Sequence, residues 1–201
     1  SSDFQKRMES QAARVEWMDQ QLGRILEQIK VMGAWDQTLV WMVSEPGNRV
    51  QEVPLQTPLR ESACGLHEAG ITTPMIVHWP AGLRARGEAR DHFVHFVDVA
   101  PTLLKIANVT WSKKAGEIYG PQLDGGDITP LLKENKAPAP RPLWWAREGS
   151  KAYRLGDWKW IAPRGKPAEL YYLKEDRSEL RDLADANFER VKEMAVSYTH
   201  L

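Results

Sequence analysis

Apolar residues recur at steps of three and four positions through the first part of the chain. The recurring positions are Val15, Met18, Leu22, Ile25, Leu26, Ile29 and Met32. Because an α-helix has 3.6 residues per turn, this spacing predicts a helix over roughly residues 5–32 that ends at Gly33. The polar residues between these positions are expected to form its solvated face.

Two short apolar runs follow, at residues 38–43 and 75–79. Both are rich in β-forming residues and are typical of strands that are buried on both faces of an α/β sheet. The stretch 44–74 between them carries glycines and prolines, so we predict a loop at the carboxyl end of the first strand, where α/β proteins bind ligands. Pro80 is expected to end the second strand.

The middle of the chain has weaker patterns. Residues 93–96 favour the edge of another strand, and Asp98 is placed to cap a helix that has Pro101 in its first turn and runs to about Ala107. The connection 110–142 is rich in glycine and proline. It contains one short helical pattern, at residues 128–133.

The period then changes to that of short strands. They are predicted at residues 143–146, 151–155, 158–162 and 169–173, separated by Gly-Ser, Gly-Asp and Arg-Gly-Lys turns. This order predicts an antiparallel C-terminal subdomain over residues 141–195, closed by a helix from Asn187 to Ala195, after a core domain over residues 1–140. Residues 196–201 resemble the translated adapter of transposase-based sequencing libraries, so we expect them to be an artefact and leave them out of the fold.

Composition sets limits on the class of protein. The 201 residues can bury one core with a small appendage, and the 27 basic residues equal the 27 acidic ones, so no global field favours nucleic acid or an anionic membrane. No apolar run of about 20 residues spans a membrane, and no charged-then-apolar leader opens the chain. It begins at Ser1 without methionine, so we expect it to be an interior piece of a larger protein.

Residues with possible chemistry have simpler explanations. Cys64 is the one cysteine, so it cannot form an internal disulfide. A loop or buried thiol is a plainer interpretation of it than a nucleophile. His78 lies inside an apolar run and is interpreted as a core histidine. His92 and His95 are expected to point to opposite faces of a strand and make a poor metal pair.

Four tryptophans fall on neighbouring predicted strands. They are Trp144, Trp145, Trp158 and Trp160. Aromatic residues at this spacing favour core or cross-strand packing. Carbohydrate contact is the alternative.

Residues 59–80 carry the most specific pattern, L-R-E-S-A-C-G-L-H-E-A-G-I-T-T-P-M-I-V-H-W-P. It resembles a segment of type I sulfatases that has the pattern L-R-G-G-K-G-x-x-x-E-G-G-x-x-x-P, followed by an apolar strand and W-P. Residues 33–40 resemble the family's G-x-x-D-N-T-L-V, and residues 96–104 its H-V-D-L-x-P-T-L-L. Weaker matches follow in the family's order at residues 124–132, 154–159 and 169–179, so the resemblance covers nearly all of residues 10–195.

This resemblance implies the C-terminal part of an alkaline-phosphatase-like α/β sandwich, with a mostly parallel sheet flanked by helices and a small antiparallel subdomain. It also implies hydrolysis of sulfate esters by a formylglycine, made from cysteine or serine in C/S-x-P/A-x-R, beside a calcium ion. We do not expect this motif within the chain itself, and Cys64, which is followed by Gly-Leu-His, does not fit it. We expect the nucleophile to lie upstream of Ser1 or to be absent, and this chain alone to be inactive.

Two site positions depart from the family pattern. Where the family has the calcium-binding S-D-N-G, this chain has Ser44-Glu45-Pro46-Gly47. Glu45 keeps a carboxylate as a candidate metal ligand, but its side chain is one methylene longer, and Pro46 offers no side-chain oxygen. Ala63 replaces the lysine that would grip a sulfate oxygen, and Glu61 adds a charge that would repel an anion. The resemblance therefore predicts a degenerate metal and sulfate site.

Three further residues are candidates for substrate binding. Arg60 could bind an anion bidentately, although a structural arginine is the plainer interpretation. His67 takes a position near the family's pocket and is a possible proton donor. Arg147 stands where many members have W-E-H-E-G, and an exposed strand arginine is the alternative. Glu68, the glutamate of E-G-G, is expected to fix the loop.

Two functions follow as hypotheses. The first is part of an arylsulfatase-like sulfuric ester hydrolase that acts on a sulfated small molecule or carbohydrate. The second is an inactive relative that binds sulfated glycans or another partner. A phosphoester or phosphonate hydrolase of the same superfamily is a third, less favoured because the metal-binding Asp/His pairs are not seen. The resemblance also implies a periplasmic or extracellular location.

Overall fold

The computed structural model describes residues 2–44, 59–60, 65–84, 86–111 and 122–200. Its contacts divide the chain into two units. One consists of Ser1–Val31, Met42–Ile76 and Pro140–Leu201, and the other of Met32–Trp41 and Val77–Ala139. The division into residues 1–140 and 141–195 stays a prediction.

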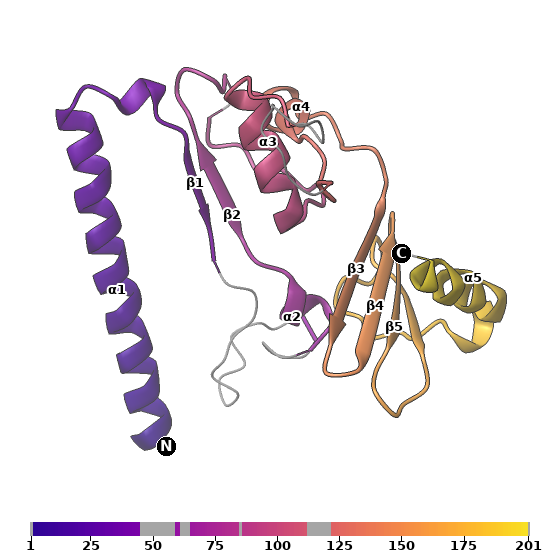
Figure 1. Cartoon of the computed structure of the whole chain (residues 1–201). Helices are drawn as coiled ribbons and strands as arrows, with labels where there is room; N and C mark the ends of the chain where they lie inside the picture. Colours follow the sequence, from indigo (N-terminus) through magenta and orange to yellow (C-terminus); the bar gives the residue numbers. More distant parts are fainter. Residues whose placement is uncertain (1, 45–58, 61–64, 85, 112–121, 201) are drawn as a thin grey trace. The chain divides into compact units, whose positions relative to one another are not determined.

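The long N-terminal helix is confirmed as α1, Ser2–Val31 (Figure 1). Gly33 follows with a φ of 69°, the left-handed conformation that ends helices. The predicted apolar stripe is present, but much of it is exposed: Val15 is 50%, Met18 56% and Ile25 59% accessible. Within the described part of the chain, no helix has the length and apolar character that crossing a bilayer requires.

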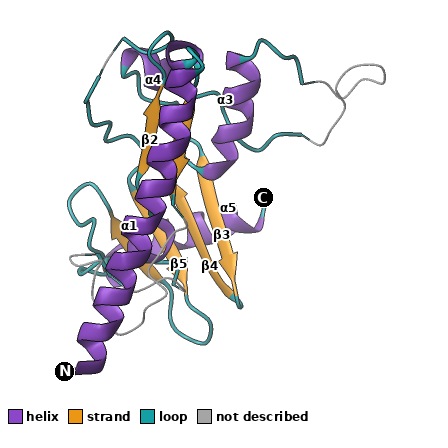
Figure 2. Ribbon diagram, turned by 90° about the vertical axis from the view of Figure 1, so that its left-hand side faces the viewer, coloured by secondary structure: helices purple, strands orange, loops and turns teal. Residues whose placement is uncertain are grey.

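The first unit contains a four-stranded antiparallel sheet, as predicted. Its strands are β3 (Pro142–Arg147), β4 (Ser150–Leu155), β5 (Trp158–Ala162) and β6 (Glu169–Tyr172), in the order β3-β4-β5-β6 (Figure 2). Glu148 and Gly149, with φ of 49° and 84°, join β3 to β4. Two successive positive φ values match the twist of a tight hairpin.

Alternate residues of this sheet build two apolar layers, because successive side chains of a strand point to opposite faces. One layer contains Leu66, Ala152, Ile161, Tyr171 and Leu173, and the other Tyr153, Trp160, Leu170 and Met194. Met194 belongs to α5 (Phe188–Thr199), which packs on β4 and β5 (Figure 1).

The tryptophans of the sheet differ in burial. Trp160 is buried, and Trp145 and Trp158 pack against the two layers, whereas Trp144 is half exposed. Helix α5 continues past the predicted end at Ala195, and the ring centre of Tyr198 lies 5.8 Å from that of Trp160. The assignment of residues 196–201 to an adapter stays a prediction.

Two further strands, β1 (Val40–Val43) and β2 (Met75–His78), pair with each other. They confirm the two predicted apolar strands, although β1 starts two residues later than expected. The predicted burial on both faces is wrong for the described residues of this pair, since Met42 and Ile76 are exposed. Residues 45–58 of the predicted loop between the strands lie outside the described residues.

The second unit contains α3 (Val99–Ile106) and α4 (Thr129–Glu134), together with the 3-10 helices η1 (Trp35–Gln37) and η2 (Phe96–Asp98). The predicted strand edge at residues 93–96 is wrong. His95 N donates to Asp98 Oδ2 at 2.8 Å, and Val97 N donates to His95 Nδ1 at 3.3 Å. This reciprocal capping box turns the chain into η2, because two side chains satisfy the backbone donors of its first turn.

The α3 helix begins after Asp98, as predicted, but the Asp98 side chain does not cap it. Asp98 Oδ1 instead accepts from Gly126 N at 2.8 Å, so this buried carboxylate ties residues 124–126 to the start of the helix. Gly125 passes so close that a Cβ atom there would lie 1.9 Å from Val97 O and 2.7 Å from Asp98 N. The backbone contact requires glycine at this position.

We therefore expect Gly125→Ala to lower the free energy of unfolding by about 1–3 kcal/mol, because overpacking against backbone cannot be relieved by a rotamer change. Gly126→Ala is the matched control, since its Cβ would meet nothing within 4 Å. Thermal unfolding followed by circular dichroism measures both. Equal midpoints for the two variants would contradict this account of Gly125.

Candidate functional site

Residues 59–74, the part of the sulfatase-like pattern that precedes β2, form the sulfatase-like segment, which lies against the antiparallel sheet in the first unit. Its described residues are 59–60 and 65–74, and they include α2, Glu68–Ile71. Ala69 N donates to Arg60 O at 3.3 Å, which holds the two described parts of the segment together. Leu66 and Ile71 pack into one apolar layer of the sheet. Residues 61–64 lie outside the described residues.

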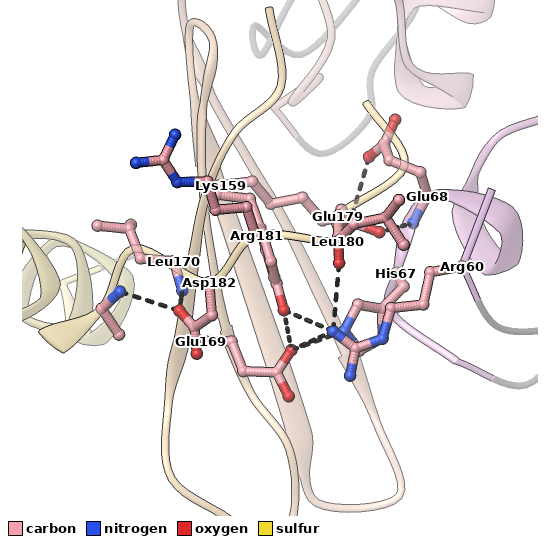
Figure 3. A network of polar contacts seen from close by, with 12 residues as sticks. Arg60, His67, Glu68, Lys159, Glu169, Leu170, Glu179, Leu180, Arg181 and Asp182 are labelled. Atoms are coloured by element: carbon pink, nitrogen blue, oxygen red, sulfur yellow. Dashed lines mark hydrogen bonds and ion pairs between the residues drawn. The ribbon is translucent and has the colours of Figure 1, made fainter. Parts of the chain in front are cut away.

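Three side chains converge on the carboxylate of Glu169 in β6 (Figure 3). Glu169 Oε2 accepts from Tyr171 Oη at 2.6 Å, from His67 Nε2 at 2.8 Å and from Arg60 Nη1 at 3.3 Å. The same Arg60 nitrogen donates to Tyr171 Oη at 2.6 Å and to Glu179 O at 3.3 Å. Arg60 and His67 are thus anchored on one strand of the sheet.

The protonation states in this group follow from its geometry. Burial alone would raise the pKa of Glu169, but the hydrogen bonds from Tyr171 and His67 and the charge of Arg60 lower that pKa below its usual value. Burial, reinforced by the Glu169 carboxylate, raises the pKa of the Tyr171 hydroxyl. At neutral pH Glu169 is therefore an anion, and Tyr171 keeps its proton and donates a hydrogen bond to it.

A second group of charges is buried beside the first. Lys159 Nζ lies 2.9 Å from Glu68 Oε1 and 2.8 Å from Glu179 Oε1, and Arg154 Nη1 lies 3.9 Å from Glu68 Oε2. Glu179 Oε2 also accepts from Glu68 N at 2.6 Å. Thr72 Oγ1 donates to Glu68 Oε2 at 3.3 Å. Burial raises the pKa of the Glu179 carboxyl, against the charge of Lys159, which acts in the other direction.

The predicted site residues are therefore only partly brought together. Arg60 and His67 share Glu169, while Arg147 lies on β3, with its Nε 3.8 Å from Glu148 Oε1. Glu45 lies outside the described residues. Substrate binding by Arg60, His67 and Arg147 stays a prediction. The contacts of Arg60 are those of the structural arginine that the sequence offered as the plainer interpretation.

Sequence reasoning missed the partners of this segment. Glu169, Glu179 and Lys159 come from a strand, a turn and another strand, and in the sequence they belong only to weak matches to the family pattern. Lys159 belongs to the sequence Arg-Leu-Gly-Asp-Trp-Lys and has no exposed surface in the structure. A lysine followed directly by Trp160 and Ile161, within a short apolar strand, was the one available signal of a buried charge.

One stretch does contain the letters of the nucleophile motif. Residues 10–14 read S-Q-A-A-R, which matches S-x-A-x-R, so the expectation that the motif is absent is wrong on the letters alone. Ser10 lies inside α1, more than two turns from its start, and is exposed. Helical N–H groups away from the first turn are already bonded, so they cannot bind a sulfate oxygen there. We do not assign Ser10 as a nucleophile.

The described residues do not offer a site for a calcium ion. In the ranges that the structure describes, no three or more His, Cys, Asp and Glu side chains gather into a group that could hold a metal. Calcium needs six to eight oxygen ligands, and the buried carboxylates of Glu68 and Glu179 are already bound to Lys159. These residues do not fit the ion, and we derive no step through it.

We expect Glu169→Gln to lower the free energy of unfolding at pH 7 by about 1–2 kcal/mol, because its three donors lose a charged acceptor. The pKa of Glu169 is lowered in the folded state. The difference in the free energy of unfolding between Glu169→Gln and the unaltered chain should therefore be fully present above pH 4.3, about the pKa of a glutamate in the unfolded chain. It should disappear as the pH falls further. Chemical denaturation from pH 7 to pH 3 measures it.

The control for this comparison is Glu175→Gln, an exposed carboxylate three residues after β6. It should change stability little at any pH. A Glu169→Gln difference that is the same at pH 3 and pH 7 would contradict the proposed charge interaction.

Comparisons with known proteins assign the family. The family model Sulfatase matches residues 2–109. Human steryl-sulfatase is 28% identical over 127 residues, which are 59% of this chain and 21% of that protein. The solved structure of Ps i-CgsB in complex with k-i-k-neocarrahexaose has a TM-score of 0.80 and 24% identity, covering 90% of this chain and 40% of that chain.

A second solved structure, of BT4656 in complex with its substrate D-glucosamine-2-N,6-O-disulfate, has a TM-score of 0.64 and 21% identity, and covers 92% of this chain and 38% of that one. The likeness to solved structures confirms the predicted mixed α/β fold. The chain spans less than half the length of each of these three proteins. Since the family model matches more than half of its residues, this chain belongs to the sulfatase family.

Proposed function

We propose that the protein containing this chain is an arylsulfatase-like sulfuric ester hydrolase, and that this chain supplies the C-terminal part of its catalytic domain. The observation that carries the proposal is the anchoring of the described residues 59–60 and 65–72 to the antiparallel sheet and its following turn. Arg60, His67 and Glu68, which belong to the sulfatase-like pattern, are each held by charged partners in the sheet or its following turn. Such fixed geometry suits a segment that positions a substrate.

In this family a formylglycine supplies the nucleophile, and we propose that it is contributed by residues outside this chain. A calcium ion would be held there as well, with Glu45 as the one candidate ligand from this chain. The chain's own contribution is the orientation of residues 59–72. Because Ala63 stands where the family has lysine, we expect weaker binding of the sulfate group by this segment.

We propose that the substrate is a sulfated small molecule or carbohydrate. Support comes from the ligands in the two solved neighbours, one a neocarrahexaose and the other a glucosamine disulfate. The balanced charge of this chain, with 27 basic and 27 acidic residues, gives no support to nucleic acid as a partner. A periplasmic or extracellular location is proposed from the family resemblance alone.

The second candidate is an inactive sulfatase relative that binds sulfated glycans. The sequence at the site favours it, because Pro46 removes a metal-ligand oxygen, Ala63 removes a cation, and Glu61 adds an anion. All three changes weaken a sulfate site. Half-exposed Trp144 on β3 offers an aromatic surface for a sugar ring.

The test begins with the reading frame upstream of Ser1. The extended protein is expressed, and release of p-nitrophenol and of inorganic sulfate is measured with p-nitrophenyl sulfate and with sulfated oligosaccharides. We expect a C/S-x-P/A-x-R motif upstream, and turnover that disappears when its cysteine or serine is replaced by alanine. An extended protein that binds sulfated oligosaccharides without hydrolysing them would establish the second candidate. Hydrolysis of phosphate or phosphonate esters alone would overturn both.

A further inference from the structure

Lys159 is a fully buried cation at the second position of β5. Its ammonium group lies between two carboxylates that are also buried, Glu68 at the start of α2 and Glu179 in the turn after β6 (Figure 3). Arg154 on β4 adds a second buried cation near Glu68. These four residues bring together two positive and two negative charges, so a buried lysine is tolerable here.

Glu179 holds Glu68 and Arg60 by two direct contacts, and it reaches Glu68 a second time through Lys159. Its Oε1 binds Lys159, its Oε2 accepts from the backbone N–H of Glu68 at 2.6 Å, and its carbonyl accepts from Arg60 at 3.3 Å. Glu68 is in turn held at both its backbone and its side chain. The first residue of α2 therefore has its position set by groups from outside its own helix.

The turn that carries Glu179 has an uncommon conformation. Glu179 has a φ of 56°, in the left-handed region that a residue with a side chain seldom adopts. Asp176 supports the turn, since its carboxylate accepts from Leu180 N at 3.1 Å and Arg181 N at 2.8 Å, and its carbonyl accepts from Glu179 N at 3.2 Å. A strained residue persists only where the surroundings hold it. Here they direct both its carboxylate and its carbonyl at the segment.

We propose that Lys159 and Glu179 are positioning residues, which couple the antiparallel sheet to α2 and so fix the described part of the sulfatase-like segment. They act through Glu68 and Arg60 and touch no reacting group. Only the link to catalysis rests on the proposed function. The coupling itself is a property of this chain and is tested without substrate.

The test is hydrogen–deuterium exchange of the full chain, with protection factors for the amides of Glu68, Ala69, Gly70 and Thr72. We expect Lys159→Met to lower these factors about tenfold or more, while the amides of β3 and β4 keep theirs. Lys166→Met, an exposed lysine in the β5–β6 connection, is the matched control and should change neither set.

The pH profile separates positioning by charge from packing of the lysine stem. Without Lys159, the buried Glu179 carboxyl loses the cation that lowers its pKa, so burial favours its protonated form in the folded state. Because that carboxyl binds a proton more tightly in the folded than in the unfolded chain, the variant's loss of protection should be small below the unfolded pKa of about 4.3 and grow as the pH rises. A loss due only to packing would be the same at every pH.

A second variant keeps the test decisive if Lys159→Met does not fold. Glu179→Gln is isosteric and neutral, retains an oxygen for Glu68 N, and should lower protection at the same amides by a smaller factor. Unchanged protection at residues 68–72 in the folded variants would overturn the proposal. So would a loss that spreads equally over the strands and does not vary with pH. Neither result would bear on hydrolysis of sulfate esters by the longer protein.

Discussion

Purified residues 1–201 are expected to release p-nitrophenol from p-nitrophenyl sulfate no faster than buffer does. Enzymatic accelerations of about a million-fold or more need an activated nucleophile, and general positioning cannot replace it. Cys64 has neither the proline nor the arginine of the modification motif, and Ser10 lies exposed within a helix. Continuous absorbance measurements over several hours, with calcium present and absent, check this expectation.

The control concerns residues 10–14, whose sequence S-Q-A-A-R matches the modification motif. Ser10→Ala should behave as the unaltered chain does, and mass spectrometry of the peptide around Ser10 should show an unmodified serine. Saturable turnover by the purified chain would contradict the expectation. Its loss in Ser10→Ala would place the nucleophile on α1.

Self-association through α1 is the second large effect that we expect. Val15, Met18 and Ile25 lie on one stripe of the helix and are each at least half exposed. Among the described elements, α1 packs extensively against none. Because contiguous apolar surface associates in water, the isolated chain should bind a hydrophobic dye and elute as oligomers at micromolar concentration.

Replacing Val15, Met18 and Ile25 by lysine or glutamate should abolish most dye binding and yield a monomer by size-exclusion chromatography with light scattering. The control replaces Gln20 and Gln28, exposed polar residues of the same helix, with charged residues. Oligomers that persist in the first variant, or disappear equally in the second, would show that another surface is responsible.

Much of the fold follows from local patterns in the sequence. The 3.6-residue period located α1, and the alternating pattern with Gly turns located β3 to β6, because both depend on neighbours along the chain. The strand expected at residues 93–96 failed for a specific reason. The Asp98 side chain accepts from His95 N and the His95 side chain accepts from Val97 N, and this capping box outweighs the strand preference of the phenylalanines.

The site was less accessible from sequence. Glu68 was expected to fix a loop, and its contacts are of that kind, but its partners lie far along the chain: Lys159 is 91 residues away, and Glu179 binds its amide from a separation of 111. No local period encodes such pairs. A charged residue in a strand suggests a solvated face, and only the three-dimensional arrangement shows that Lys159 is buried between two carboxylates.

The β3–β6 meander also implies an order of folding. Its strands are neighbours both along the chain and in the sheet, so their hydrogen bonds close only short loops, whereas the Glu68–Lys159 pair must close a loop of 91 residues. Contacts between residues that are close in sequence form earlier, because closing a short loop loses less chain entropy. The meander is thus expected to be complete before the sulfatase-like segment docks. Variants at Lys159 should then mainly speed unfolding, while variants in the hairpins should slow refolding.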